Sequence, residues 1–306
     1  MITLCASFLL KIVPLYLNVL LGFIAGKFTE ISRDSIARLL IYIFAPIVFF
    51  NGVANIPLDL NILFLPFMIL AISVLLCGVF YRLSGLIWQD STKNLVAFSA
   101  GTGNSGYFGL PLALLLLDDK GEGIYIMAVL GMVLYENTVG FYIIARGKHS
   151  VSDCLLKLVK LPALYAIAFG LLINLLNISL PEIIVEFIDH IKAAFSVLGL
   201  VIIGLGMAAL KKIKTDFSFI GMTFLAKFIA WPALIGMIIA GDRYFGIFDS
   251  GTYQALTLFS FVPLAANLVI FSAVFDIHTE KAASAVFFSI IVSIIYIPFM
   301  VGCFIL

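Results

Sequence analysis

The stretch Gly101-Thr-Gly-Asn-Ser-Gly-Tyr-Phe-Gly-Leu-Pro111 lies in the middle of one long apolar segment and interrupts it. Glycine costs a helix roughly 1 kcal/mol per position relative to alanine, and proline costs about 3 kcal/mol and removes a backbone donor. The stretch therefore predicts a broken helix. Backbone groups freed at membrane depth cannot face lipid, so the break must be buried in protein or line a wet cavity. Broken helices at this depth are typical of the binding sites of secondary transporters.

The composition of the 306 residues indicates a polytopic membrane protein, with the lipid bilayer as its surroundings. Hydrophobic residues make up 63% of the chain and charged residues 11%, whereas a soluble domain carries about 25% charged residues. The net charge of +1 gives no reason to expect a nucleic-acid partner. The first ten residues have neither a charged leader nor a small-residue cleavage site, so we expect them to belong to the first span.

Ten apolar stretches have about the 20 residues that a helix needs to cross a bilayer. The fold class predicted is therefore an all-α bundle of ten transmembrane helices. The stretches are residues 3–26, 34–54, 61–84, 94–117, 122–145, 158–178, 190–210, 216–240, 252–274 and 282–305.

Lysine and arginine orient this bundle, because positive loops are retained in the cytoplasm. Alternate loops hold very unequal numbers of them, and the poorer set has only Lys120 and Arg243. Both termini are therefore predicted on the non-cytoplasmic face. The richer, cytoplasmic set comprises Lys27, Arg33, Arg38, Arg82, Lys93, Arg146, Lys148, Lys157, Lys160, Lys211, Lys212, Lys214 and Lys281.

The prolines suggest an internal repeat. Pro14 in the first span is matched by Pro162 in the sixth, and Pro111 in the fourth by Pro263 in the ninth, at nearly the same offset along the chain. Five spans separate each pair, an odd number, so the second copy must be inverted. We therefore expect two inverted five-helix repeats, at residues 1–146 and 158–306, joined by a short cytoplasmic loop at 147–157.

The ninth span also places a proline and an asparagine in one membrane helix, in Pro263-Leu-Ala-Ala-Asn267. If helices four and nine break and cross near the midplane, each resuming after its proline, their restarted halves aim partial positive charge at one point. That arrangement suits a carboxylate. The alternative is that the prolines only kink the helices and the asparagines only bind neighbouring helices. The expected substrate-binding residues are Gly103, Asn104, Ser105, Gly106, Pro111, Pro263 and Asn267.

Ionisable residues inside membrane spans are functional candidates by default. Glu136, followed by Asn137, lies in the fifth span, and Lys227 lies deep in the eighth. A buried carboxyl could carry a proton, and Lys227 could balance Glu136, a substrate carboxylate or freed carbonyls. A purely structural ion pair is the alternative. The sequence leaves open whether transport is coupled to H⁺, to Na⁺ or to neither, and it predicts no metal site and no other cofactor.

These motifs resemble the auxin efflux carrier family. Asn104-Ser-Gly-Tyr-Phe-Gly-Leu-Pro111 is similar to its fourth-helix signature, and Pro263 to Asn267 resembles its ninth-helix crossover. Residues 21–50 and 289–298 are similar too. The resemblance implies a ten-helix inverted repeat with crossing helices four and nine, and transport of small organic anions. Its bacterial members include malonate and malate permeases, which implies the bacterial inner membrane. The long cytoplasmic loop of many plant members is missing.

Other classes of function are considered beside a transporter. An intramembrane enzyme would need a nucleophile with its base, paired aspartates or a metal set, but His149, His190 and His278 are far apart at loops or span ends. We therefore expect no enzyme. A passive anion channel and a membrane sensor that binds the same ligand remain alternatives, and a homodimer is a partner that the sequence leaves open.

Overall fold

The protein is helical throughout the part that is described. The computed structural model describes residues 2–56, 59–145, 161–209 and 215–304, with side chains from residue 12 onward. Within these ranges there is no β-strand. The expected short loop at 147–157 and seven of the expected cytoplasmic lysines and arginines lie outside them.

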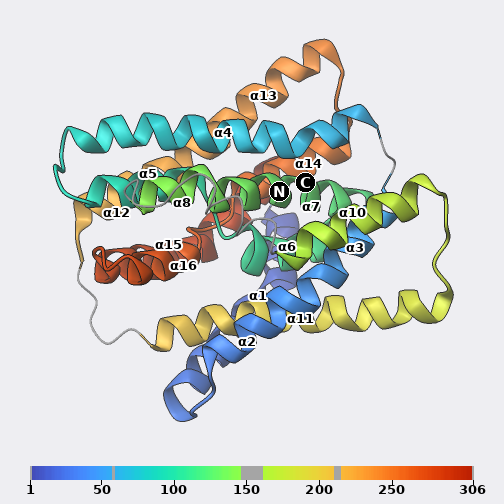
Figure 1. Ribbon diagram of the computed structural model, residues 1–306, viewed down its shortest axis with the longest axis horizontal. Coiled ribbons are helices and arrows are strands. Elements are labelled where there is room, and N and C mark those ends of the chain that lie inside the picture. The colour runs from blue at the N-terminus through green and yellow to red at the C-terminus, as the bar shows by residue number, and fades with distance from the viewer. Residues whose placement is uncertain (1, 57–58, 146–160, 210–214, 305–306) are drawn as a thin grey trace.

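Within the described ranges the helices follow one another with short connections (Figure 1). Several of the predicted spans consist of two or three consecutive helices. The elements are α1 (Ile2–Phe28), α2 (Arg33–Leu39), η1 (Leu40–Phe44), α3 (Ala45–Ala54), α4 (Leu60–Gly85), α5 (Thr92–Gly101), η2 (Ser105–Gly109), α6 (Leu110–Leu116), α7 (Asp119–Asn137), α8 (Val139–Ile144), α10 (Pro162–Leu175), α11 (Glu182–Ala208), α12 (Phe217–Phe224), η3 (Leu225–Ala230), α13 (Trp231–Phe245), α14 (Ser250–Ser260), α15 (Asn267–Val274) and α16 (Thr279–Phe304).

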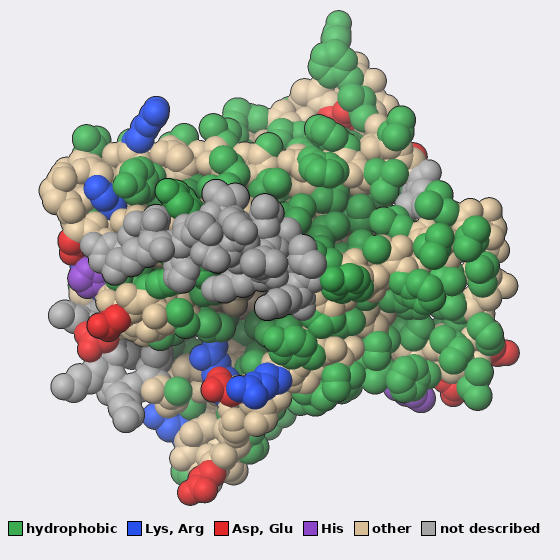
Figure 2. Space-filling view, in the orientation of Figure 1, with side chains coloured by type: hydrophobic (Ala, Val, Ile, Leu, Met, Phe, Trp, Pro, Cys, Tyr) green, Lys and Arg blue, Asp and Glu red, His purple; other side chains and the backbone are tan. Residues whose placement is uncertain are grey.

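Six helices among the described residues are long and apolar enough to cross a membrane. Large apolar side chains cover much of the outside: Phe67 is 60% exposed, and Ile295 is 80% exposed. Figure 2 shows hydrophobic side chains over most of the right half of one face, while the visible lysines and arginines lie in the left half. An exposed apolar surface of this extent is unfavourable in water and suits a lipid environment.

The helices pack as two bundles. In one bundle α1 packs along α11, and α3 along α10. In the other, α4 packs on α5 and α7, and α16 packs on α12 and α15. Helices α3 and α11 touch the second bundle at α7 and α6, so the two bundles share an interface. Figure 1 shows α4 across the top of the view and α11 across the bottom.

Three π-helical turns mark the positions before prolines. The turns η1, η2 and η3 each end two residues before a proline, at Pro46, Pro111 and Pro232. A proline inside a helix donates no hydrogen bond, and its ring clashes with the carbonyl four residues earlier. Widening the turn moves that carbonyl away and lets the helix continue. At Pro46, Pro111 and Pro232 the chain therefore stays helical through the proline.

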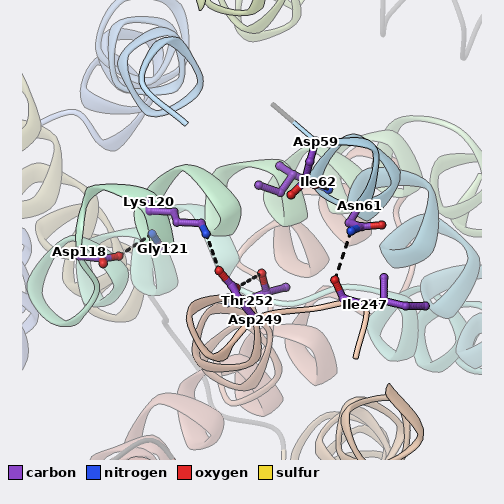
Figure 3. A network of polar contacts seen from close by, with 9 residues as sticks. All are labelled: Asp59, Asn61, Ile62, Asp118, Lys120, Gly121, Ile247, Asp249 and Thr252. Carbon is purple, nitrogen blue, oxygen red and sulfur yellow. Dashed lines mark hydrogen bonds and ion pairs between the residues drawn. The ribbon is translucent and has the colours of Figure 1, made fainter. Parts of the chain in front are cut away.

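Aspartates cap the N-termini of three helices (Figure 3). Asp59, Asp118 and Asp249 each accept a hydrogen bond of 2.8 Å from a backbone amide in the first turn of α4, α7 and α14, respectively. Lys120 at the start of α7 forms an ion pair with Asp249. A carboxylate at a helix N-terminus satisfies free amides and offsets the helix dipole. The caps stabilise the starts of the three helices, and the ion pair joins those of α7 and α14.

Two predicted boundaries differ from the structure by at least five residues. The seventh span was expected from residue 190, but α11 begins at Glu182, directly after Pro181. Its first two turns are mostly apolar and exposed, but they hold Glu182 and Glu186. These charges placed the segment in a polar break, although an acidic first turn favours a helix start. The eighth span was expected to end at residue 240, but α13 continues to Phe245. It stops at Gly246, which has a φ of 66°, because glycine accepts the left-handed conformation that ends helices.

A prediction follows from the contact of α1 with α11. A β-carbon placed on Gly204 would overlap the carbonyl oxygen of Val19, a backbone atom that cannot rotate away. Gly204→Ala should therefore force the two helices apart and destabilise the protein by at least about 1 kcal/mol. Thermal unfolding in detergent would show a lower midpoint. Gly78→Ala is the matched control, because nothing lies within 4 Å of its added carbon. Equal midpoints for both variants would contradict the close approach.

Candidate functional site

The two interrupted helices meet at their breaks. Helix α5 ends at Gly101 and η2 starts at Ser105, while α14 ends at Ser260 and α15 starts at Asn267. The backbone N–H of Asn104 donates a 2.9 Å hydrogen bond to the carbonyl of Pro263. The two extended stretches are thus joined directly, and two helix ends and two helix starts converge on one buried point.

The helix of the fourth predicted span resumes earlier than the sequence suggested. We expected it to restart after Pro111, but η2 begins at Ser105, and Pro111 lies in the first turn of α6. The glycines and Asn104 make the break, and the wide turn of η2 accommodates the proline. In the ninth span the expectation holds, since Pro263 lies inside the break itself.

Backbone carbonyls freed at the fourth-segment break find side-chain donors. The hydroxyl of Tyr135 donates to the carbonyl of Phe98 at 3.2 Å, and the hydroxyl of Tyr125 donates to that of Ser105 at 3.3 Å. The indole N–H of Trp231 donates to the carbonyl of Ala100 at 2.8 Å. Such partners are what a non-helical backbone at this depth needs. The break is therefore held rigidly by three large aromatic side chains.

A cavity of about 340 Å³ opens beside the crossing. It extends to Leu161 and Ala163, where α10 begins. Apolar side chains form most of its wall, including Phe49, Phe195 and Phe271. The candidate residues that line it are Gly103, Asn104, Ser105, Gly106, Glu136, Asn137 and Asn267.

Asn104 presents an unused donor. Its side chain is 4% exposed, and its amide nitrogen has no hydrogen-bond partner among the described residues. A buried amide without a partner costs about 1–3 kcal/mol, so it is expected to have a ligand or water in function. The N–H of Ser105 donates to the carbonyl of Gly103 at 2.7 Å, but the N–H groups that follow it lie at the positive end of helix η2. The site can therefore supply several hydrogen bonds to an anion.

Glu136 ties the crossing to helix α7. One of its carboxylate oxygens accepts a hydrogen bond from the hydroxyl of Thr102, and the other accepts one from the amide nitrogen of Asn267 at 2.7 Å. Glu136 thus contacts both broken helices, and its side chain is buried at the wall of the cavity. Asn267 therefore donates to Glu136, whereas the amide of Asn104 is free.

Lys227 lies near the break but not beside Glu136. Its side chain is fully buried, and its ammonium nitrogen has no hydrogen-bond partner among the described residues. It lies 4.7 Å from the centre of the Trp231 ring, a cation–π contact. A β-carbon on Gly103 would overlap it. It does not line the cavity, so a balance of charge by direct contact with Glu136 is absent from this structure.

Most of the candidate residues thus line the large cavity, and three do not. Pro111, Pro263 and Lys227 are not among the residues that line the cavity, although the carbonyl of Pro263 bonds to Asn104. Asn137 lines it but donates its amide to the carbonyl of Val133 at 2.9 Å. Sequence reasoning missed Thr102 as a partner of Glu136. Its position inside the interrupted stretch was the available signal.

The comparison with known families agrees with this architecture. The profile of the family described as Membrane transport protein matches residues 7–301, nearly the whole chain. No protein with a curated description matches the chain. A match of this extent, together with the long apolar helices, makes the chain an integral membrane protein. It belongs to the membrane transport protein family, the auxin efflux carrier family that its broken-helix motifs resemble.

Proposed function

We propose that the protein is a secondary transporter that moves a small organic anion, a carboxylate, by alternating access. The observation that carries the proposal is the free, buried amide of Asn104 at the meeting point of two broken helices, facing a cavity. A carboxylate there would accept hydrogen bonds from this amide and from the amides that begin η2. No buried cation is required for such binding.

The cavity also bears on the substrate. Among the described residues that line it, Glu136 is the only Asp, Glu, Lys, Arg or His. The remaining wall is mostly apolar. The site therefore favours an anion with one carboxylate near Asn104 and a compact apolar remainder. Malonate and malate, the substrates of bacterial members that the chain resembles, are smaller and more polar and belong in the same test panel.

The packing supports a moving-bundle mechanism. We propose that the ten helical segments form two inverted repeats of five and that one bundle shifts against the other. The bundle with α1, α3, α10 and α11 would then act as the scaffold, and the crossing helices would belong to the bundle that moves. The cavity reaches the start of α10, which the charge bias assigns to the cytoplasmic side.

Counterflow in proteoliposomes tests the function. Purified protein is reconstituted with an unlabelled mono- or dicarboxylate inside, and labelled substrate is added outside. A carrier accumulates label transiently by exchange, a channel only equilibrates it, and a sensor binds it without moving it. Transient accumulation of at least one carboxylate is expected. Its absence across the panel, with protein that is monodisperse and inserted, would contradict the proposal.

Topology gives a separate prediction. We propose that residues 146–157 face the cytoplasm and that both termini face outward, because lysine and arginine concentrate on one set of loops. In a cysteine-free background, an impermeant thiol reagent on whole cells should label Gly251→Cys and spare Ser150→Cys until the cells are lysed. The opposite pattern would invert the assignment. Ser150 lies outside the described residues.

A further inference from the structure

A second cavity also reaches Asn104. Asn104 and Ala266 line both the large cavity and a narrow one of about 40 Å³. One water molecule needs about 10–15 Å³ of such space, so the narrow cavity can hold a carboxylate group but not a whole substrate. Its wall comes mainly from α2, α11, α15 and α16, and it includes Arg33 and Gly206.

The two cavities differ in charge. Glu136 lines the large cavity, and Arg33 is the only charged side chain among the described residues of the narrow one. Tyr107, which lines the large cavity, lies within electrostatic reach of both Arg33 and Glu136. An anion approaching Asn104 is therefore repelled by ionised Glu136 on one side and attracted by Arg33 on the other. A guanidinium also matches a carboxylate with two parallel hydrogen bonds.

The guanidinium of Arg33 lies beside helix α11 and is not neutralised by a described carboxylate. Arg33 is the first residue of α2 and is half-buried. A β-carbon on Gly206 of α11 would lie 3.5 Å from its guanidinium carbon, so the group lies against the backbone of that helix. Within the described ranges, no carboxylate forms an ion pair with it. Its charge is thus available to a ligand.

We propose that Arg33 and Asn104 form a two-point anion site in which Arg33 binds the substrate carboxylate first and Asn104 receives it. This rests on the proposed function. Arg33 would then be the first binding residue, at the basic, cytoplasmic end of the path. Its field raises the local concentration of anions at the narrow cavity, an effect that salt screens.

The test compares two arginines on the same short helix. Arg33→Gln should raise the half-saturating carboxylate concentration for exchange by about 3- to 30-fold, less than the roughly 10- to 150-fold for a fully buried charged hydrogen bond, because Arg33 is partly solvated. Its maximal rate should stay near that of the wild type, and the difference should shrink at high salt. Arg38→Gln removes the same charge from an exposed position of α2 and should leave exchange unchanged.

A conservative variant and a binding measurement separate this role from a folding defect. Arg33→Lys keeps the charge and should recover most of the salt-sensitive affinity. Substrate affinity of each monodisperse variant in detergent should follow the same order. If Arg33→Gln and Arg38→Gln behave alike, the two-point site is wrong while the transporter proposal stands. If wild-type protein neither binds nor exchanges any carboxylate of the panel, the proposed function fails and this inference fails with it.

Discussion

Asn104→Ala should weaken substrate binding by roughly 5- to 150-fold while the protein still inserts and purifies as one species. The variant removes a buried amide donor that has no other partner, and losing a hydrogen bond to a buried charged ligand costs about 1–3 kcal/mol. The fold should tolerate the change because Asn104 contributes to the crossing through its backbone N–H, which alanine keeps. Ligand-dependent thermal stabilisation or direct binding of labelled carboxylate measures the loss.

The matched control is Asn94→Ala in the same broken segment. The amide of Asn94 donates to the carbonyl of Ile143 at 2.9 Å, away from the crossing. That change removes the same chemical group from the same helical segment, so it can lower stability but should leave affinity unchanged. Should Asn104→Ala bind substrate as tightly as Asn94→Ala, Asn104 only holds helices together and the substrate binds elsewhere.

Much of the architecture could be predicted from glycine, proline and hydropathy alone. The interruptions at Gly101 to Asn104 and around Pro263 lie inside the stretches where the sequence placed them, because a membrane helix has few ways to accommodate such residues. Only the restart at Ser105, ahead of Pro111, differs from the expectation. The start of α11 at Glu182 could not be found in the same way. Glu182, Glu186 and Asp189 divide an otherwise mostly apolar stretch, and interpreting these charges as a loop concealed a helix that runs through them.

The sequence singled out candidate residues that the structure brings together, but it did not indicate their contacts. A charge inside an apolar span marks Glu136 and Lys227 equally, yet Glu136 bonds to Thr102 and Asn267 while Lys227 lies against Trp231. Which of two buried ions meets which partner depends on how helices rotate against one another, and the sequence pattern does not encode that rotation simply. Arg33 was visible only as one of many cytoplasmic charges until packing brought it to the same cavity as Asn104.

Glu136→Gln should abolish accumulation driven by a pH gradient and leave exchange intact. If one proton moves with each monovalent anion, substrate accumulates in the more alkaline compartment by tenfold per pH unit, or about 100-fold across two units. An amide cannot release a proton, so the variant should reach a ratio near one. Label in proteoliposomes with an imposed gradient measures this ratio, after passive uptake by empty liposomes is subtracted.

The contacts of Glu136 explain why exchange should survive. Ionised Glu136 accepts the amide donor of Asn267, so that donor is withheld from the substrate. A protonated carboxyl or a glutamine offers a donor instead, and Asn267 can turn its oxygen toward it and release its own N–H groups to the cavity. Glu122→Gln is the control, since Glu122 also lies on α7 and is buried but pairs with Lys192 at 2.8 Å. Gradient-driven accumulation that persists in Glu136→Gln would make Glu136 structural, and accumulation that instead follows a sodium gradient would identify Na⁺ as the coupling ion.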